Sequence, residues 1–564
     1  MNTNTQNTSS IDEKITRFWE LAKKKYQIPA NSEFKLSDRT WPDKDIEKAP
    51  IWCSVDLRDG NQSIENPMNI EQKLEYFNIL VQMWFKEIEV WYPWASTNDD
   101  EFIKKLIKEK LIPDDVKIQV LTPCIEKNIK KSREILKWAK NVIIHLYNPT
   151  SPIQRKVVFE RSKEETIELA EKWVDWIKKY FNNFEWNLQL QYSPESFTWT
   201  EIKFAEEICK RVINKWDSFW WKDIIFNLPA TVENSTPDKY ADKIEYMSKS
   251  IKGFMEENKS KVKAIISAHV HNDRWTAIAS TELAIKAWAD RVEWIIWVPN
   301  WERSWNTDIW TVALNMFTHW IPPWLDLSNI WEISKKISEI IKIPIHPRYP
   351  YTWELVHTAY SWGHQDAIKK WLDKQKEREK NWDIFWNVPY LPIDPKDIWY
   401  KIDIRITSQS GVSWIIYILN ESWYNIPEDM KKSIKTIFEP IIKKLPWILP
   451  HEEIKEIFKE NFVNVNSPIS IDSFDFDKIW KDWKRKWNGT INEVSNYIWE
   501  TFSIPFEIKS YIEKNQSEWR NANAVTYFEI EYNKKIYFWC WIDKDIEVSA
   551  LKWLISTINI ALRK

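Results

Sequence analysis

The chain has 564 residues, of which 80 are Lys or Arg and 82 are Asp or Glu, so its formal net charge is −2. An even balance of charge gives no basic surface for nucleic acid or an anionic membrane, and no apolar run approaches the ~20 residues that span a bilayer. The polar start MNTNTQNTSS has no signal-peptide core, and the four cysteines are scattered without a CxxC pair, so we expect a cytoplasmic protein of several domains.

A strand–helix alternation follows a predicted N-terminal extension, residues 1–50. Helical patterns separate apolar strand-like runs, as where Ile70, Leu74 and Phe77 recur at helical spacing. Eight strands are predicted, at Trp52–Leu57, Glu87–Val90, Lys117–Leu121, Val142–Leu146, Asn187–Gln191, Ile224–Leu228, Ala264–Val270 and Arg291–Ile296. Eight βα units within residues 51–330 favour a TIM (β/α)8 barrel of the α/β class. An open doubly wound sheet is the alternative.

The alternation stops near residue 330. Residues 331–445 are predicted to form a helical subdomain that contributes to the active site, with proline-rich connections IPIHPRYPY and VPYLPIDP. Residues 446–564 are predicted to be a linker and a C-terminal α+β domain. In that domain we expect strands near Val525–Tyr532 and Lys535–Cys540, and a final helix from about Val548.

Tryptophan is abundant in this chain and glycine is scarce. There are 41 tryptophans and five glycines, whereas glycine ordinarily makes up about 7 % of residues. Trp84, Trp138 and Trp288 each come between a predicted helix and a predicted strand, where glycine commonly ends a helix in the left-handed conformation. We predict that most tryptophans are glycines in the native protein, because UGA codons that the source decodes as glycine would be written here as tryptophan. The alternative is an aromatic-rich protein.

Two motifs at predicted strand ends contain residue types that bind metal ions. LRDGNQ follows the first strand and supplies Arg58 and Asp59, and the carboxyl ends of barrel strands carry active sites. HVHND ends the seventh strand, where His269 and His271 share one face because they are two residues apart. Asn306, after the eighth strand, would add an amide oxygen. Such a ligand set suits Mg²⁺, Mn²⁺ or Zn²⁺, and ordinary polar loop groups are the alternative.

Further polar groups follow other strands. His145, Glu195 and Thr231 each come after a predicted strand, so they are expected to face the same barrel mouth. His364, in SWGHQDAI, and Tyr400 fall outside the barrel, and an imidazole titrates in the range that suits acid–base catalysis. For each of these residues alone, an ordinary polar loop or helix-end position is the alternative.

The motifs occur together in one order from about residue 35 to the end of the chain. In sequence they are LRDGNQ, HLYNPTSP, YSPESF, LPATVE, HVHND, the NxERSxN loop, HPRYPY, GHQDAIKK and ITSQSG. This combination resembles the long form of the 2-isopropylmalate synthases. LRDGNQ and HxHND mark a wider superfamily of metal-dependent condensing enzymes and lyases, whereas HLYNPTSP, YSPESF and GHQDAI are more specific.

The resemblance implies an acyltransferase that condenses acetyl-CoA with 3-methyl-2-oxobutanoate, giving 2-isopropylmalate and CoA in the first committed step of leucine biosynthesis. It implies one divalent metal ion, held by Asp59, His269, His271 and Asn306. It implies catalytic roles for Arg58, Glu195, His364 and Tyr400, and substrate contacts from Arg58, His145, Ser193 and Thr231. It also implies a homodimer with leucine as inhibitor; a purely structural dimerisation tail is the alternative.

The resemblance bears on the tryptophans as well. The family has tryptophan at positions 41 and 52, and it has glycine where this chain has Trp84, Trp91, Trp138, Trp199, Trp275, Trp288, Trp301, Trp305 and Trp353. Three other functions remain open from the residues alone. They are a sister condensing enzyme such as a homocitrate or citramalate synthase, a retro-Claisen lyase with the same barrel and metal, and an inactive scaffold if the tryptophans are real.

Overall fold

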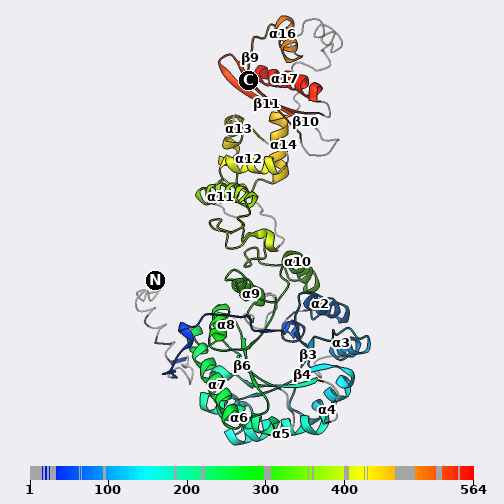
Figure 1. The fold of residues 1–564 in the computed structure, drawn as a ribbon, viewed down its shortest axis with the longest axis vertical. Coiled ribbons are helices and arrows are strands. Elements are labelled where there is room, and N and C mark those ends of the chain that lie inside the picture. The colour runs from blue at the N-terminus through cyan, green and yellow to red at the C-terminus, as the bar shows by residue number, and fades with distance from the viewer. Residues whose placement is uncertain are drawn as a thin grey trace, which may run out of the picture. The chain divides into compact units, whose positions relative to one another are not determined.

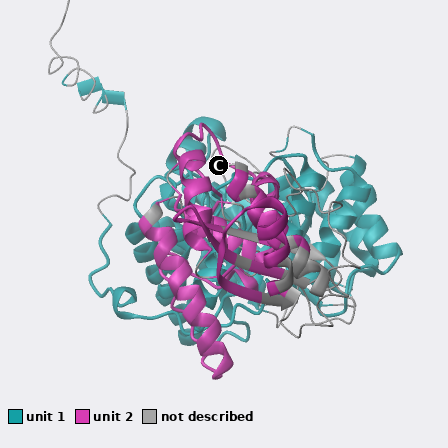
Figure 2. Cartoon of the chain, turned by 90° about the horizontal axis from the view of Figure 1, so that it is seen from above, with its two compact units in different colours: residues 1–353, 397–400 teal, residues 354–396, 401–564 magenta. Residues whose placement is uncertain are grey.

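The structure is a computed structural model. It describes residues 34–463 and 490–563 and isolated positions before residue 34, with gaps at 63, 65, 93–96, 183, 185–186, 218–222, 297–305, 354, 358–360, 399–404, 409, 423, 425, 428–429, 516–523 and 544–545. The chain forms two compact units, residues 1–353 with 397–400 and residues 354–396 with 401–564 (Figure 2). None of the described helices combines the length and hydropathy required to span a membrane.

A closed barrel of eight parallel strands forms the first unit (Figure 1). The strands are β1 (Ile51–Ser54), β2 (Glu87–Trp91), β3 (Lys117–Thr122), β4 (Asn141–Pro149), β5 (Asn187–Glu195), β6 (Ile224–Ala230), β7 (Ala264–Val270) and β8 (Arg291–Trp294). Each strand pairs with the next along the chain, and β8 pairs with β1, which closes the sheet. The predicted TIM barrel and all eight predicted strands are therefore confirmed.

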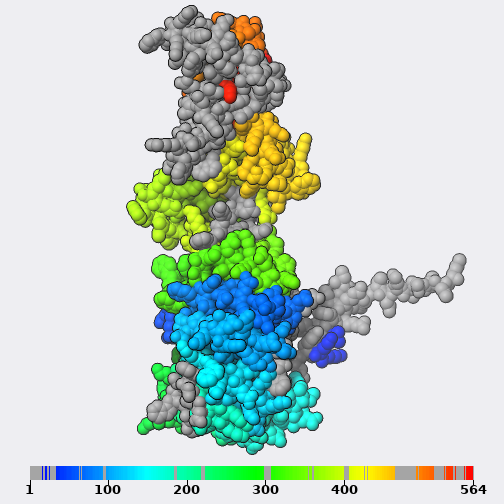
Figure 3. All heavy atoms as spheres, turned by 90° about the vertical axis from the view of Figure 1, so that its right-hand side faces the viewer, coloured from blue at the N-terminus to red at the C-terminus, as the bar shows by residue number. Residues whose placement is uncertain are grey.

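Helices surround the barrel. They are α2 (Ile70–Gln82), α3 (Thr97–Lys108), α4 (Glu126–Ile135), α5 (Lys163–Phe181), α6 (Ile202–Asp217), α7 (Pro237–Glu257) and α8 (Ala277–Lys286), followed by α9 (Ile309–Phe317) and α10 (Ile330–Ile341). The surface that carries α2, α3 and α4 faces the viewer in Figure 3. Capping boxes begin α2 at Asn69 and α5 at Ser162, where each side chain accepts a hydrogen bond from an otherwise unpaired backbone N–H.

The first and last strands end earlier than the sequence predicts. β1 ends at Ser54, and a short π-helix, η2 (Asp56–Gly60), follows it. The cause is the buried Asp56 carboxylate, which accepts hydrogen bonds from Ser54 Oγ (2.7 Å) and Tyr76 Oη (2.8 Å). The same carboxylate accepts a hydrogen bond from the backbone N–H of Ile296, so that N–H does not take part in the hydrogen bonds of the sheet. The turn at Asp56 brings the next residues over the barrel mouth.

The second unit contains α11 (Trp362–Lys380), α12 (Val412–Glu421), α13 (Lys431–Lys443), α14 (His451–Phe462) and α16 (Thr490–Phe502). It also contains β9 (Glu507–Asn515), β10 (Ala524–Tyr532), β11 (Lys535–Asp543) and α17 (Ile546–Arg563). The three strands form an antiparallel sheet in the order β11-β10-β9, and Leu419, Phe458 and Ile530 share one apolar core. Two of these strands and the final helix were predicted, whereas β9 was not.

Candidate metal centre

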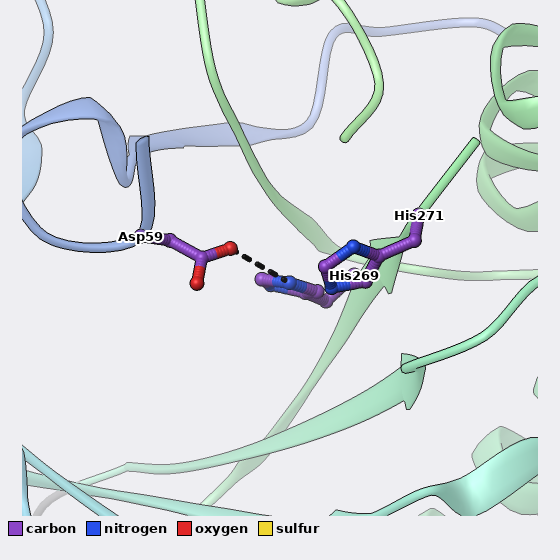
Figure 4. Close-up of side chains that lie close together, drawn as sticks. All are labelled: Asp59, His269 and His271. Atoms are coloured by element: carbon purple, nitrogen blue, oxygen red, sulfur yellow. Dashed lines mark ion pairs between the residues drawn. The ribbon is translucent and has the colours of Figure 1, made fainter. Parts of the chain in front are cut away.

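Three side chains converge at the carboxyl-terminal mouth of the barrel (Figure 4). Asp59 comes from η2 after β1, His269 lies in β7, and His271 follows β7. One potential ligand atom from each lies within 4.8 Å of the other two. Asp59 Oδ2 is 3.8 Å from His269 Nε2, and the ring centroids of the two histidines are 5.4 Å apart. The structure thus brings Asp59 together with two histidines that follow it by about 210 positions in the sequence.

The Asp59 carboxylate has two further neighbours. Arg58 Nη1 donates to Asp59 Oδ1 at 2.6 Å, and Asn306 Nδ2 donates to Asp59 Oδ2 at 2.7 Å. An isolated bridge between His271 and Asn306 holds the asparagine at the site. Burial raises the pKa of Asp59, but Arg58 and the two histidines more than offset this effect, so the pKa lies below its ordinary value. The carboxylate is therefore charged at neutral pH.

The donor set fits a divalent cation. Asp59, His269 and His271 are each at least nine-tenths buried, and a carboxylate with two imidazoles is a common ligand combination for such ions. The amide of Asn306 is oriented with its nitrogen toward Asp59, so its oxygen is not the atom nearest that carboxylate. Its role as a fourth ligand stays a prediction.

The predicted substrate residues line one cavity of about 280 Å³ beside the three candidate ligands. Its walls include Arg58, Asp59, His145, Tyr147, Ser193, Glu195, Asn227, Thr231, His269 and His271. His145 Nε2 lies 2.7 Å from Ser193 Oγ, which also accepts a hydrogen bond from Asn227 Nδ2 at 3.1 Å. Thr231 Oγ1 accepts the backbone N–H of Ser196 at 2.9 Å. The cavity therefore offers the Arg58 guanidinium, the His145 imidazole and the hydroxyl groups of Ser193 and Thr231 to a small polar molecule.

The two residues predicted outside the barrel have different outcomes. His364 lies in the first turn of α11 in the second unit, where it is exposed, and its ring stacks on Tyr390 with centroids 4.0 Å apart. Tyr400 falls outside the described residues. Glu195, to which the resemblance gives a catalytic role, lies at the end of β5 in the first unit. The catalytic roles of Glu195, His364 and Tyr400 stay predictions.

Buried charged residues beneath the site were not predicted. Glu89 Oε1 bonds His145 Nδ1 at 2.9 Å and its other oxygen accepts from Arg58 Nε at 2.5 Å. Glu293 Oε2 bonds His269 Nδ1 at 3.2 Å. A signal was available, because Glu87 and Glu89, like Arg291 and Glu293, are two residues apart within apolar strands. Such pairs face the same side of a strand, here the barrel interior.

Comparisons with known proteins cover almost the whole chain. Residues 49–337 match the HMGL-like family, and residues 354–420 match the alpha-isopropylmalate synthase, post-catalytic domain-like family. The 2-isopropylmalate synthase of Acetoanaerobium sticklandii is 40 % identical over 547 residues, which are 93 % of this chain and 94 % of that protein. The 2-isopropylmalate synthases of Clostridium acetobutylicum and Helicobacter hepaticus are each 40 % identical, over 93 % and 95 % of this chain and 97 % and 98 % of theirs.

Proposed function

Because the chain belongs to the 2-isopropylmalate synthase family, we propose that it condenses acetyl-CoA with 3-methyl-2-oxobutanoate. A carbon–carbon bond forms between the acetyl methyl carbon and the keto carbon, and water then cleaves the thioester to release CoA and 2-isopropylmalate. The observation that carries the proposal is the convergence of Asp59, His269 and His271 beside Arg58 at one barrel mouth. Leucine biosynthesis is the process that this product serves.

A divalent metal ion held by Asp59, His269 and His271, with Asn306 beside them, would act as a Lewis acid and orient the oxo acid. Mg²⁺, Mn²⁺ and Zn²⁺ all suit these donors. Supporting the proposal, the three side chains are buried and one of them is a charged carboxylate. The measurement is calorimetric titration of the metal-stripped protein with each ion. One site per chain is the expected result.

The chain's own residues supply the remaining chemistry. Arg58, fixed between Asp59 and Glu89, presents a permanent positive charge to the cavity, where it stabilises an enolate or alkoxide oxygen. Thr231 and the hydrogen-bonded pair of His145 and Ser193 bind the oxo acid. Proton removal from the acetyl methyl group falls to His364, with Glu195 and Tyr400 assisting, by resemblance to the family.

The test is CoA thiol release from acetyl-CoA with a panel of oxo acids and a divalent metal. Both the printed chain and a version with glycine at the family's glycine positions are assayed. We expect the highest kcat/KM with 3-methyl-2-oxobutanoate. Preference for pyruvate or 2-oxoglutarate would instead assign a citramalate or homocitrate synthase, and no thiol release with any oxo acid in either version would reject a condensing enzyme.

Regulation and assembly follow from the same resemblance. We assign leucine binding to the C-terminal α+β region and a homodimer to the intact chain. Leucine is expected to lower the rate, whereas valine serves as the matched control with one methylene fewer. Light scattering of the full chain is expected to give the mass of two chains. An unchanged rate with leucine would leave this region with a structural role only.

A further inference from the structure

Glu293 in β8 is fully buried and uses both carboxylate oxygens. Oε2 lies 3.2 Å from His269 Nδ1. Oε1 accepts hydrogen bonds from Arg291 Nη1 (2.7 Å), Gln119 Nε2 (2.8 Å) and Gln191 Nε2 (2.6 Å). A carboxylate with three donors on one oxygen has little freedom to rotate, so it presents Oε2 to the histidine in a fixed direction.

The hydrogen bond constrains the histidine ring. An ionised carboxylate only accepts hydrogen bonds, so Nδ1 of His269 must carry the proton in this contact. The neutral ring then has its lone pair on Nε2, the atom 3.8 Å from Asp59 Oδ2. We propose that Glu293 is a positioning residue that fixes the Nδ1-protonated tautomer of His269 and aims its Nε2 at the metal site. This inference rests on the proposed function only for its metal-binding part.

Arg291 helps to hold the Glu293 carboxylate in place. Its side chain is fully buried and also donates to Glu87 Oε2 at 2.6 Å, Ser267 Oγ at 2.9 Å and Gln119 Oε1 at 2.7 Å. Glu87 is thus a second buried carboxylate on the same guanidinium. Glu87 bonds Arg291 and Lys117, neither of which is a histidine. It provides a matched control for Glu293.

The first experiment is calorimetric titration of metal-stripped protein with Mn²⁺ and with Zn²⁺. Glu293→Gln is expected to weaken binding about 10- to 100-fold, the usual effect of losing a partner behind a metal ligand. Glu87→Gln removes a carboxylate from the same arginine and is expected to leave the affinity unchanged. An equal loss in both variants would reduce Glu293 to a structural residue and overturn the proposal.

The second experiment needs neither metal nor substrate. The eight histidines are labelled with ¹⁵N in the metal-free protein, and the His269 signals are assigned by their disappearance in His269→Gln. We expect the neutral ring to carry its proton on Nδ1 and to have an unprotonated Nε2. A proton on Nε2 instead would overturn the proposal even if the condensing activity is established, and the expected tautomer would stand even if that activity is absent.

A different observation carries a second inference. Six described tryptophans have left-handed backbone angles, with φ of 70° at Trp84, 60° at Trp275, 73° at Trp288, 67° at Trp320, 55° at Trp324 and 64° at Trp382. The Cβ of an L-residue crowds the backbone in this region, so glycine is the residue that adopts it routinely.

Four of the six end a helix with the hydrogen bonds of a Schellman motif, in which glycine is the usual left-handed residue. They are Trp84, Trp288, Trp320 and Trp382. The N–H of the next residue bonds a carbonyl five positions back, as in Phe85 to Leu80 (3.1 Å), Ala289 to Ala284 (2.9 Å), Ile321 to Met316 (3.0 Å) and Asp383 to Arg378 (3.1 Å). The backbone at these four positions is therefore the one that glycine adopts with least strain, an observation independent of composition.

The indoles at these positions bury little surface. This holds most clearly for Trp320 and Trp382, whose exposed fractions are 89 % and 92 %, whereas Trp84 is 58 % and Trp288 is 38 % exposed. Trp41 and Trp52 differ in both respects. Each is buried, and the indole N–H donates to Asp242 Oδ1 (2.9 Å) in Trp41 and to the Pro323 carbonyl (2.6 Å) in Trp52. Two kinds of tryptophan are thus distinguishable by conformation and burial.

We infer that the left-handed tryptophans are glycines in the protein as its own cells make it, through UGA decoded as glycine, and that Trp41 and Trp52 are true tryptophans. Peptide mass mapping of the protein purified from its source cells tests this. Glycine is expected at 84, 288, 320 and 382 and tryptophan at 41 and 52, with UGA and UGG codons respectively. Tryptophan at the four helix-end positions would overturn the inference.

Discussion

The barrel mouth and helix α11 carry their predicted catalytic groups in different environments. Asp59, His269 and His271 retain 5–7 % of their accessible surface, and one potential ligand atom of each lies within 4.8 Å of the other two. His364 in α11 is exposed, and its ring stacks on Tyr390. Burial fixes the positions of side chains before any ligand binds, whereas the position of an exposed histidine depends on the groups that surround it in the working enzyme. Substitutions at the barrel mouth should therefore lower both metal affinity and turnover, whereas substitutions in α11 should lower turnover and leave metal affinity unchanged.

The largest effect is expected from Asp59→Ala. Loss of the carboxylate removes a ligand and leaves Arg58 without one of its two acidic partners, so turnover should fall about 10³-fold or more, as expected from several kcal/mol of lost charge stabilisation. His271→Ala should behave alike. The control is Asp115→Ala, an aspartate exposed on the surface and paired with Lys86. Near-normal thiol release in Asp59→Ala would refute the metal assignment.

A smaller loss is expected from His364→Asn in α11. If this imidazole removes the acetyl proton, kcat should fall about 10²-fold, while calorimetric metal affinity stays unchanged because the barrel network is intact. His451→Asn, at the first position of α14 in the same unit, is the matched control. A kcat equal to that of the control would show that the proton is removed elsewhere.

The pH dependence of stability distinguishes the two regions further, because the groups responsible for it are buried in the barrel unit. Burial raises the pKa of Asp56 to about 7 despite hydrogen bonds from Ser54 and Tyr76, against ~3.9 in the unfolded chain. Between these values the folded protein holds a proton that the unfolded chain has lost, so stability falls as pH rises from ~4 to ~7, by up to ~1.4 kcal/mol per pH unit.

Asp56→Asn removes this group from the titration. The free energy of unfolding, measured with urea across this pH range, should then fall less steeply than in the unaltered protein. Asp308 is a second buried carboxyl, with its pKa raised by burial to about 6, and Asp308→Asn should flatten only the acidic part of the range. Identical pH profiles for Asp56→Asn and the unaltered protein would contradict the assignment.

The smallest effects are expected from replacing left-handed tryptophans in both units. Trp320→Gly after α9 and Trp382→Gly after α11 relieve the same strain at indoles that are about nine-tenths exposed, so each should raise the free energy of unfolding of its own unit by ~1 kcal/mol. Trp41→Gly removes a buried, hydrogen-bonded indole and should destabilise by ~3–5 kcal/mol. Destabilisation by Trp320→Gly would show that the indole contributes to the native fold.

The sequence predicted the barrel well because its signals are local and repeat eight times. The alternation of strands and helices fixes which ends share a mouth, so Asp59 and His271 could be placed together without any coordinates. Strand ends were harder, because β1 stops where Asp56 turns inward to bond Ile296, about 240 residues away. That contact leaves no trace in local hydrophobic patterning.

Other parts of the site depended on interactions between distant residues. Glu89 and Glu293 lie inside strands that were identified by their apolar neighbours, and their partners His145 and His269 come from other strands. β9 was missed, since its sequence EIKSYIEKN alternates weakly and carries several charges. His364 was identified by its motif alone, and a motif gives the type of residue but not where its side chain lies in space.

The most direct test of the central claim is anomalous X-ray scattering from a crystal of the protein soaked with Mn²⁺. The account predicts one strong anomalous peak at the barrel mouth, about 2.0–2.3 Å from an Asp59 oxygen and from one ring nitrogen each of His269 and His271. An anomalous peak elsewhere, or an ordered Asp59 and histidine pair with no peak between them at saturating Mn²⁺, would contradict it.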